Sequence, residues 1–148
     1  MDRGEVVTRS ESETEALGAR LAATLTPGSV VYLTGELGAG KTALARGIAR
    51  GLGAPAREVA SPTFALLHEY AGNDGRIVLR HLDLYRLADE ARELVPLGLP
   101  ESVGGAPVCV EWPGTAIRAA LPPTLEVRLE PLDDESRRIR FDSPGAAP

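Results

Sequence analysis

Two patterns of hydrophobic residues alternate along the chain and predict two kinds of element. Residues 30–33 (VVYL) and 108–110 (VCV) are unbroken apolar runs, which is typical of strands that are buried on both faces of a sheet. Leu17, Leu21 and Leu25 recur at intervals of four, as they do on the apolar face of a helix. The chain therefore combines buried strands with amphipathic helices.

Turn and capping residues divide the rest of the chain. Ser12 and Glu15 have the spacing of a capping box, which predicts that the first helix begins near them. A strong hairpin turn signal, Asn73-Asp74-Gly75, separates predicted strands at residues 65–70 and 76–82. The other expected elements are a strand at residues 5–8, helices at 42–51 and 85–94, and strands at 125–129 and 138–141 that pair across residues 133–134.

These elements predict an α/β fold with a partly parallel sheet and helices on both faces. The length of 148 residues fits one domain, which we expect to span residues 1–142. Residues 143–148 are expected to form a disordered tail.

Composition and charge argue against several classes of protein. The formal net charge is −5, which argues against a protein that grips nucleic acid by itself, because such binding depends on neutralising phosphates. No apolar run approaches the ~20 residues that cross a bilayer, and the polar, acidic N-terminus does not look like a secretory or transit peptide. Cys109 is the single cysteine, so we expect no disulfide framework and no thiolate metal cluster. These features point to a cytoplasmic protein without a membrane partner.

The strongest chemical signal is a glycine loop between a predicted strand and a predicted helix. Residues 35–42, GELGAGKT, fit the pattern G-x-x-x-x-G-K-[ST] completely, in which glycines let backbone N–H groups surround phosphate oxygens. Lys41 is the only lysine among the 16 Lys and Arg residues. Its compact ammonium can reach between the β- and γ-phosphates, where the broad fork of an arginine would not fit. We expect Lys41 to face solvent until nucleotide binds, and Thr42 to offer a hydroxyl to Mg²⁺.

A P-loop protein also needs an acid beside the metal, usually at the end of a buried strand. Two acids compete for this place. Glu111 follows an uninterrupted apolar strand, whereas Asp83 follows a strand that carries polar residues. The alternatives are that Glu111 is a solvated loop acid and that Asp83 caps a helix beginning near Tyr85.

Three further residues carry weaker signals. Thr63 lies in the sequence Ser-Pro-Thr between two predicted strands, where a threonine can sense the γ-phosphate and metal, although such sequences are also common turns. His81 is expected to be structural. Trp112, the only tryptophan, is expected to belong to the core or to a cleft wall.

Four stretches together resemble the bacterial TsaE (YjeE) family. They are GELGAGKT, SPTF at residues 61–64, HLDLYRL at 81–87 and VEWP at 110–113, and they follow the family order and spacing over roughly residues 10–140. The resemblance implies a P-loop ATPase of tRNA threonylcarbamoyladenosine synthesis that acts with the partner proteins TsaD and TsaB. TsaD would transfer the threonylcarbamoyl group, and this protein would hydrolyse ATP to keep the assembly turning over, meeting tRNA only indirectly.

The resemblance also implies roles for individual residues. Thr42 and Glu111 would be the Mg²⁺ ligands, Thr63 would belong to a switch-like loop, and Asp83 would be needed for hydrolysis. The implied nucleotide contacts are Gly35, Gly38, Ala39, Gly40, Lys41 and Thr42 for the phosphates, and Glu11, Arg137 and Arg138 for adenine.

The sequence also bears on other classes of nucleotide-binding protein. A GTPase is excluded, because its Asn-Lys-x-Asp motif cannot be formed when Lys41 is the only lysine and Asn73 the only asparagine. A small-molecule kinase stays open and would need an acceptor pocket and an arginine-bearing lid. A binding module that is switched by ATP without hydrolysing it also stays open. The chain has no glutamine, so in an ATPase an acid such as Asp83, or a partner, must position the attacking water.

Overall fold

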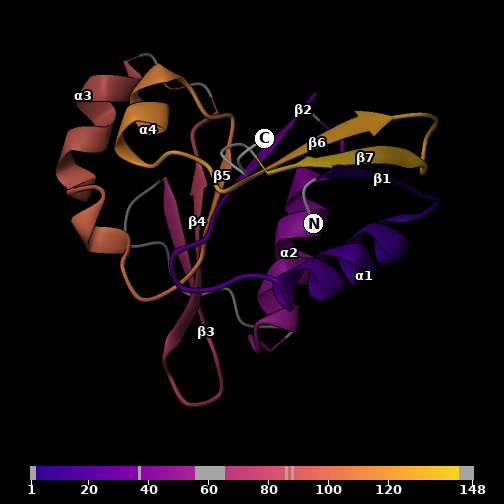
Figure 1. Cartoon of the computed structure of the whole chain (residues 1–148), viewed down its shortest axis with the longest axis horizontal. Helices are drawn as coiled ribbons and strands as arrows, with labels where there is room; N and C mark the ends of the chain where they lie inside the picture. The colour runs from indigo at the N-terminus through magenta and orange to yellow at the C-terminus, as the bar shows by residue number, and fades with distance from the viewer. Residues whose placement is uncertain (1–2, 37, 56–65, 86, 88, 144–148) are drawn as a thin grey trace.

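A seven-stranded sheet organises the computed structural model, which describes residues 3–36, 38–55, 66–85, 87 and 89–143 (Figure 1). The strand order is β1-β7-β6-β2-β5-β4-β3. The neighbours β6, β2, β5 and β4 run parallel, whereas β1, β7 and β3 are antiparallel additions at the two edges. The predicted partly parallel α/β sheet is therefore confirmed. The strands are β1 (Arg3–Thr8), β2 (Val30–Gly35), β3 (Leu67–Ala71), β4 (Ile77–Asp83), β5 (Val108–Glu111), β6 (Leu125–Pro131) and β7 (Arg137–Asp142).

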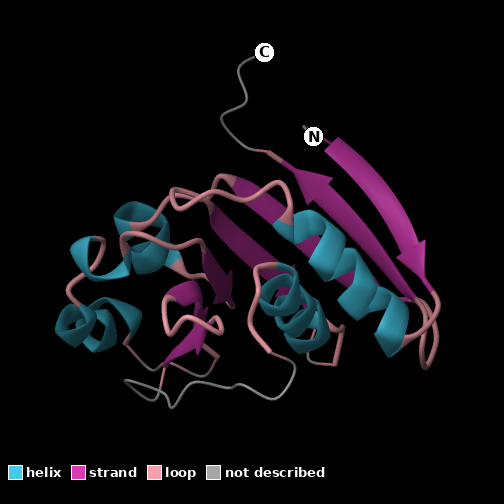
Figure 2. Cartoon of the chain, turned by 90° about the horizontal axis from the view of Figure 1, so that it is seen from below, coloured by secondary structure: helices cyan, strands magenta, loops and turns pink. Residues whose placement is uncertain are grey.

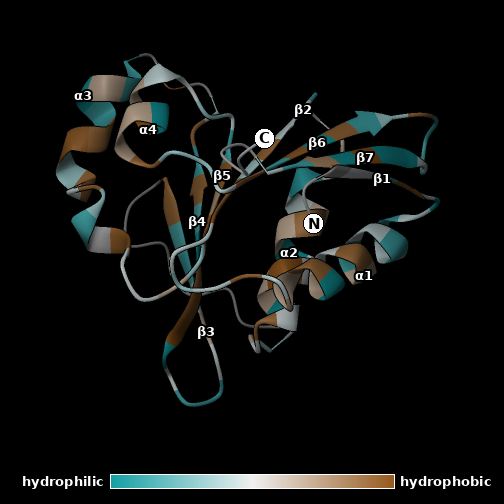
Figure 3. Cartoon of the chain, viewed as in Figure 1, coloured by the Kyte–Doolittle hydropathy of each residue, from teal (hydrophilic) through white to brown (hydrophobic). Residues whose placement is uncertain are grey.

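Helices cover both faces of the sheet, as the two perpendicular views show (Figures 1 and 2). On β2, Val31 and Leu33 join the core on one face, while Val30 and Tyr32 join the core on the other. The two cores explain why the first four residues of the strand, 30–33, are all apolar. Figure 3 shows hydrophobic stretches, coloured brown, along the strands and helices. The helices are α1 (Glu11–Ala22) and α2 (Lys41–Gly51) on the first face, and α3 (Glu90–Leu94), η1 (Val95–Leu97), η2 (Glu101–Val103) and α4 (Thr115–Ala120) on the second.

Two helix predictions need correction at their N-terminal ends. α1 begins earlier than expected, because Ser10 rather than Ser12 is its N-cap and accepts a 3.1 Å hydrogen bond from the Glu13 N–H. The helix predicted at residues 85–94 begins only at α3, where the Asp89 side chain accepts from the Arg92 N–H at 3.3 Å. In both cases an alternative capping side chain set the start.

The structure also contains three short helices that the sequence did not predict, η1, η2 and α4. Residues 144–148 of the predicted tail, and the whole loop around Thr63, lie outside the described residues. Within the described part of the chain, no helix combines the length and apolarity that crossing a bilayer requires.

The helix that carries the glycine loop is held by an unusually close crossing with α1. A Cβ placed on Gly47 of α2 would clash with the backbone carbonyl of Glu15, and one on Gly18 of α1 would clash with the Leu44 carbonyl. The two helices therefore touch backbone to backbone, which side chains larger than hydrogen would prevent. This contact fixes where α2 begins and so where the loop stands.

We expect Gly47→Ala to lower the free energy of unfolding by about 1–3 kcal/mol, because the added methyl must push α1 away from α2. Alanine's better helix propensity offsets only part of this loss, at most about 1 kcal/mol. Gly28→Ala is the matched control, since a Cβ there meets nothing within 4 Å. Urea unfolding of both variants is the measurement, and equal stabilities would contradict the close crossing.

Candidate nucleotide-binding site

A cleft of about 440 Å³ lies where α2 begins, at the carboxyl ends of β4 and β5. Open α/β sheets bind ligands at the carboxyl ends of their parallel strands. The cleft therefore occupies the place in the fold where a ligand is expected. Its lining includes Glu11, Gly38, Gly40, Lys41, Thr42, Asp83, Glu111 and Arg137, all of which the sequence singled out.

The glycine loop is shaped to receive an anion. Gly38 and Gly40 have φ angles of 81° and 100°, which glycine adopts without the steric cost that a Cβ would bring. Gly40 is also the N-cap of α2, where no side chain of the described residues caps the first turn. The free N–H groups of that turn and the positive end of the helix dipole are therefore available to phosphate oxygens.

Lys41 is buried rather than solvent-facing, which corrects the expectation from sequence. Only 4% of the residue is exposed. Its Nζ donates to the carbonyl oxygens of Gly35 and Glu36 at 2.7 and 2.9 Å, and stands 4.1 Å from the centre of the Trp112 ring. Burial lowers the pKa of the Lys41 ammonium, and the nearby carboxylates of Glu111 and Asp83 oppose that shift. Two hydrogen bonds to backbone carbonyls and a cation–π contact thus hold the ammonium in the wall of the cleft.

The two competing acids stand side by side. Asp83 ends β4 and Glu111 ends β5, and they are register partners in this parallel pair. Asp83 accepts from the Tyr85 N–H at 3.1 Å, closing a turn, so the helix-cap alternative is wrong. Glu111 is only 4% exposed, so the solvated-acid alternative is wrong too. Its Oε2 lies 2.6 Å from Nε2 of His81, a buried partner that the sequence gave no means of pairing with it.

The oxygen donors in the cleft fit Mg²⁺. The Thr42 hydroxyl and the carboxylates of Asp83 and Glu111 line the same space. Hydroxyl and carboxylate oxygens are hard ligands, which Mg²⁺ prefers together with water and phosphate oxygens. The residues present therefore suit a magnesium ion that is shared with a bound nucleotide.

Of the two arginines expected at adenine, only Arg137 lines the cleft. Arg137 lines the cleft and donates from Nη2 to the Gly38 carbonyl at 3.1 Å, which ties β7 to the glycine loop. Arg138 lies away from the cleft lining and pairs with Glu130 at 2.9 Å and Glu5 at 3.7 Å. The expectation that both arginines face the nucleotide is therefore wrong for Arg138.

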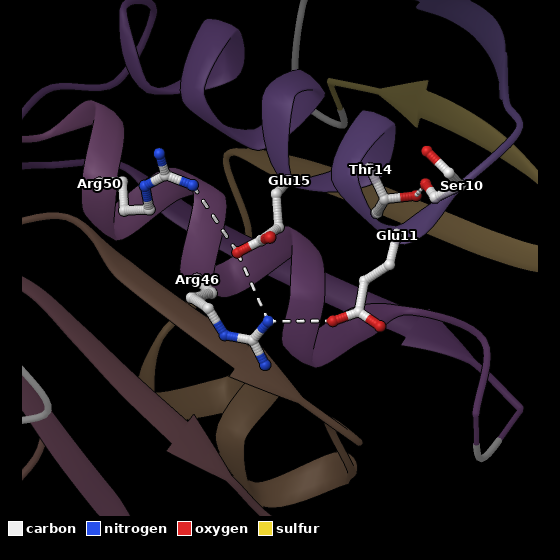
Figure 4. A network of polar contacts seen from close by, with 6 residues as sticks. All are labelled: Ser10, Glu11, Thr14, Glu15, Arg46 and Arg50. Carbon is white, nitrogen blue, oxygen red and sulfur yellow. Dashed lines mark hydrogen bonds and ion pairs between the residues drawn. The ribbon is translucent and has the colours of Figure 1, made fainter. Parts of the chain in front are cut away.

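Glu11 reaches the cleft from the first turn of α1, where it belongs to a polar network (Figure 4). The Arg46 guanidinium on α2 bridges Glu11 at 3.2 Å and Glu15 at 3.4 Å, and Arg50 reaches Glu15 at 4.0 Å. The pKa of Arg46 is raised, first by its hydrogen bond to Glu11. The network joins α1 and α2 beside the cleft.

Sequence reasoning missed several residues of the cleft wall, among them Arg46 and Tyr85. Arg46 lies one helical turn after Thr42 and shares its face of α2, a spacing that could have identified it. Tyr85 lies two residues after Asp83, and its ring packs against Trp112 with centroids 4.9 Å apart. Trp112 lines the cleft, in agreement with the expected wall position. Thr63 lies outside the described residues, and Ala39 and Gly35 support the loop without lining the cleft.

A second cavity of about 320 Å³ adjoins the cleft. The two share Thr42, Arg46, Asp83 and Glu111, while His68, Tyr70 and His81 line the second cavity from β3 and β4. Glu111 thus stands in the wall between two spaces.

Comparison with known proteins identifies relatives over most of the chain. A family model described as "Threonylcarbamoyl adenosine biosynthesis protein TsaE" matches residues 8–139. The tRNA threonylcarbamoyladenosine biosynthesis protein TsaE of Bacillus subtilis is 42% identical to this chain, over 93% of this chain and 84% of its own length. The TsaE protein of Treponema pallidum is also 42% identical, over 90% of this chain and 96% of its own length. The crystal structure of Bacillus subtilis YdiB superposes with a TM-score of 0.72 at 34% identity, covering 97% of this chain and 87% of that one.

We expect Lys41→Arg to weaken nucleotide binding at least tenfold, although the charge is kept. The broad fork of a guanidinium would not fit between the β- and γ-phosphates, and each charge-assisted bond to phosphate that is lost costs about 1.5–3 kcal/mol. Arg50→Lys, the reverse exchange on the exposed side of the same helix, should bind as wild type. Calorimetric titration with nucleotide measures both, and wild-type affinity in Lys41→Arg would refute the assignment.

Proposed function

Because the chain belongs to the TsaE family of tRNA threonylcarbamoyladenosine biosynthesis, we propose that it binds ATP with Mg²⁺ in the cleft and hydrolyses it together with TsaD and TsaB. The observation that carries this proposal is the meeting of Lys41, the uncapped start of α2 and two strand-end carboxylates in one cleft. Phosphate, metal and water each have a complementary group there.

The phosphates would lie on the glycine loop. Backbone N–H groups of the loop and of the first turn of α2 donate to them, and Lys41 exchanges its carbonyl partners for phosphate oxygens. This exchange keeps the ammonium hydrogen-bonded throughout, so little is lost when it leaves Gly35 and Glu36. The cleft thereby favours a polyphosphate over a singly charged anion.

Thr42 and Glu111 would hold Mg²⁺, which neutralises the charge that develops on the phosphates. Asp83 would then serve the water. Its Oδ1 is used by the turn at Tyr85, which leaves Oδ2 for orienting a nucleophile. The absence of glutamine from the chain supports an acid in this role.

The partnership is proposed from the family's process and from the chain's own chemistry. A net charge of −5 does not suit direct capture of tRNA, so contact with the substrate would pass through the transferase assembly. TsaD and TsaB are the partners that the resemblance implies. We expect turnover of the isolated chain to be slow and to depend on them.

The test is ATP hydrolysis measured on the chain alone and with TsaD and TsaB. The proposal requires faster, Mg²⁺-dependent phosphate release in the full mixture and continued formation of modified tRNA. Phosphate transferred to a small acceptor would instead indicate a kinase. Nucleotide binding without turnover in any mixture would indicate a switch module, and either outcome overturns the proposal.

We expect Glu111→Gln to reduce Mg²⁺-dependent turnover sharply and to leave metal-free nucleotide binding unchanged or slightly tighter, because a carboxylate repels phosphates. Titrations with and without Mg²⁺, beside a turnover assay, make the measurement. Equal loss of affinity in both titrations would mean that Glu111 supports the fold instead.

Asp83→Asn should also separate binding from hydrolysis, here with Mg²⁺ present. The amide keeps an oxygen for the Tyr85 N–H but cannot act as a carboxylate toward water, so ATP affinity should stay near wild type while partner-stimulated turnover falls. Normal turnover in the mixture would reduce Asp83 to a turn former. Loss of ATP binding would make it a ligand or a fold determinant.

A further inference from the structure

One buried polar side chain remains without a role in the proposed chemistry. The buried polar or charged residues among those described are Thr8, Thr14, Lys41, His81 and Glu111. Thr8 and Thr14 bond each other at 2.7 Å, and Lys41 and Glu111 belong to the cleft. His81, with 7% of its side chain exposed, lies against Glu111 at 2.6 Å.

The sheet register explains how His81 reaches Glu111. On the parallel pair β4 and β5, His81 stands opposite Cys109 and Asp83 stands opposite Glu111. Residues two apart on a strand share a face, so His81 projects on the same side as both acids. Its imidazole contacts Glu111 diagonally, one step back from the strand ends.

The contact is made at the wall of the second cavity. Glu111 lines both cavities, whereas His81 lines only the second one. With Glu111 ionised, as a metal-binding carboxylate is, its oxygens only accept, and the contact is then a hydrogen bond from the Nε2–H tautomer of His81 to Oε2. This leaves Oε1 for the cleft, where Thr42 also stands.

We propose that His81 is a positioning residue, which holds the Glu111 carboxylate so that Oε1 can serve Mg²⁺. The proposal rests on the proposed function, because it assumes that Glu111 is the acid that serves the metal. Side chains that hydrogen-bond a metal ligand fix its orientation, and their loss typically weakens metal binding or activity about 10- to 100-fold. A buried histidine that merely stabilised the sheet would not affect metal binding.

Two amide substitutions separate these roles. The amide of His81→Gln can place an N–H near the position of Nε2, whereas that of His81→Asn is one carbon–carbon bond shorter and falls short of Glu111. We expect the Mg²⁺ concentration that half-maximally tightens ATP binding to rise 10- to 100-fold in His81→Asn and to stay within a few-fold of wild type in His81→Gln. Metal-free ATP affinity should stay unchanged in both, which also shows that both are folded.

A double substitution tests whether His81 acts through Glu111. In a Glu111→Gln background, His81→Asn should change the Mg²⁺ response no further. The test does not depend on the two variants folding equally well, because the proposal requires the Mg²⁺ response of His81→Gln to stay near that of wild type. If both amides respond to Mg²⁺ alike, or if the two sites act independently, the positioning role is wrong.

Failure of the proposed function is recognised separately. These titrations follow binding and need no turnover, so they read out the metal site even if the chain does not hydrolyse ATP. A wild-type chain that hydrolyses ATP while the two amides behave alike overturns the positioning role only. A wild-type chain whose ATP affinity ignores Mg²⁺ overturns the metal site, and the role of His81 with it.

Discussion

The buried ammonium of Lys41 is the contact on which the rest of the site depends. It is surrounded by the carbonyl oxygens of Gly35 and Glu36, at and just after the end of β2, and by the ring of Trp112, just after β5. A charge can be buried at moderate cost only when its donors are satisfied in this way. Trp112 adopts a φ of 58°, which is uncommon for a bulky residue and is the kind of strain found at functional sites. The Lys41 side chain thereby joins the ends of β2 and β5 beside the glycine loop.

The sheet and the helices fix the parts that this arrangement brings together. Because β4 and β5 are parallel and in register, Asp83 and Glu111 stand side by side, and the neighbouring β2 leads into the glycine loop. On the other side, the close contact at Gly47 and the bridges from Arg46 to α1 hold the start of α2. Loop, acids and helix end are thus positioned by rigid elements, which limits the reorganisation that nucleotide binding needs.

The sequence predicted the parts of the site better than their contacts. The glycine loop and the strand-end acids are local patterns, and the cleft contains Lys41, Asp83 and Glu111 together. Burial of Lys41 could not be predicted, since it depends on a tryptophan about seventy residues away. Arg137 and Arg138 were both expected at the nucleotide, although neighbours on a strand point to opposite faces and only one could be. The pairing of His81 with Glu111 needed the register of two strands.

The starts of helices α1 and α3 also could not be predicted from local sequence alone. Ser10 and Ser12 are each followed three residues later by glutamate, so both satisfy the capping-box pattern, and only packing selects Ser10. The segment after Asp83 has helical periodicity, yet the Asp83–Tyr85 turn and the packing of Tyr85 on Trp112 delay the helix until Asp89 caps it. Local propensity allowed these alternatives, and tertiary contacts chose among them.

The most direct test of this account uses the fact that Lys41 is the only lysine. A chain labelled with ¹³C and ¹⁵N in lysine alone gives a single set of side-chain signals in NMR spectra. With Nζ 4.1 Å from the centre of the Trp112 ring, the ring current should shift the Lys41 Cε protons upfield in the free chain. Saturation with ATP and Mg²⁺ should move them as the ammonium turns to the phosphates. Signals at ordinary lysine positions that ATP leaves unchanged would contradict the account.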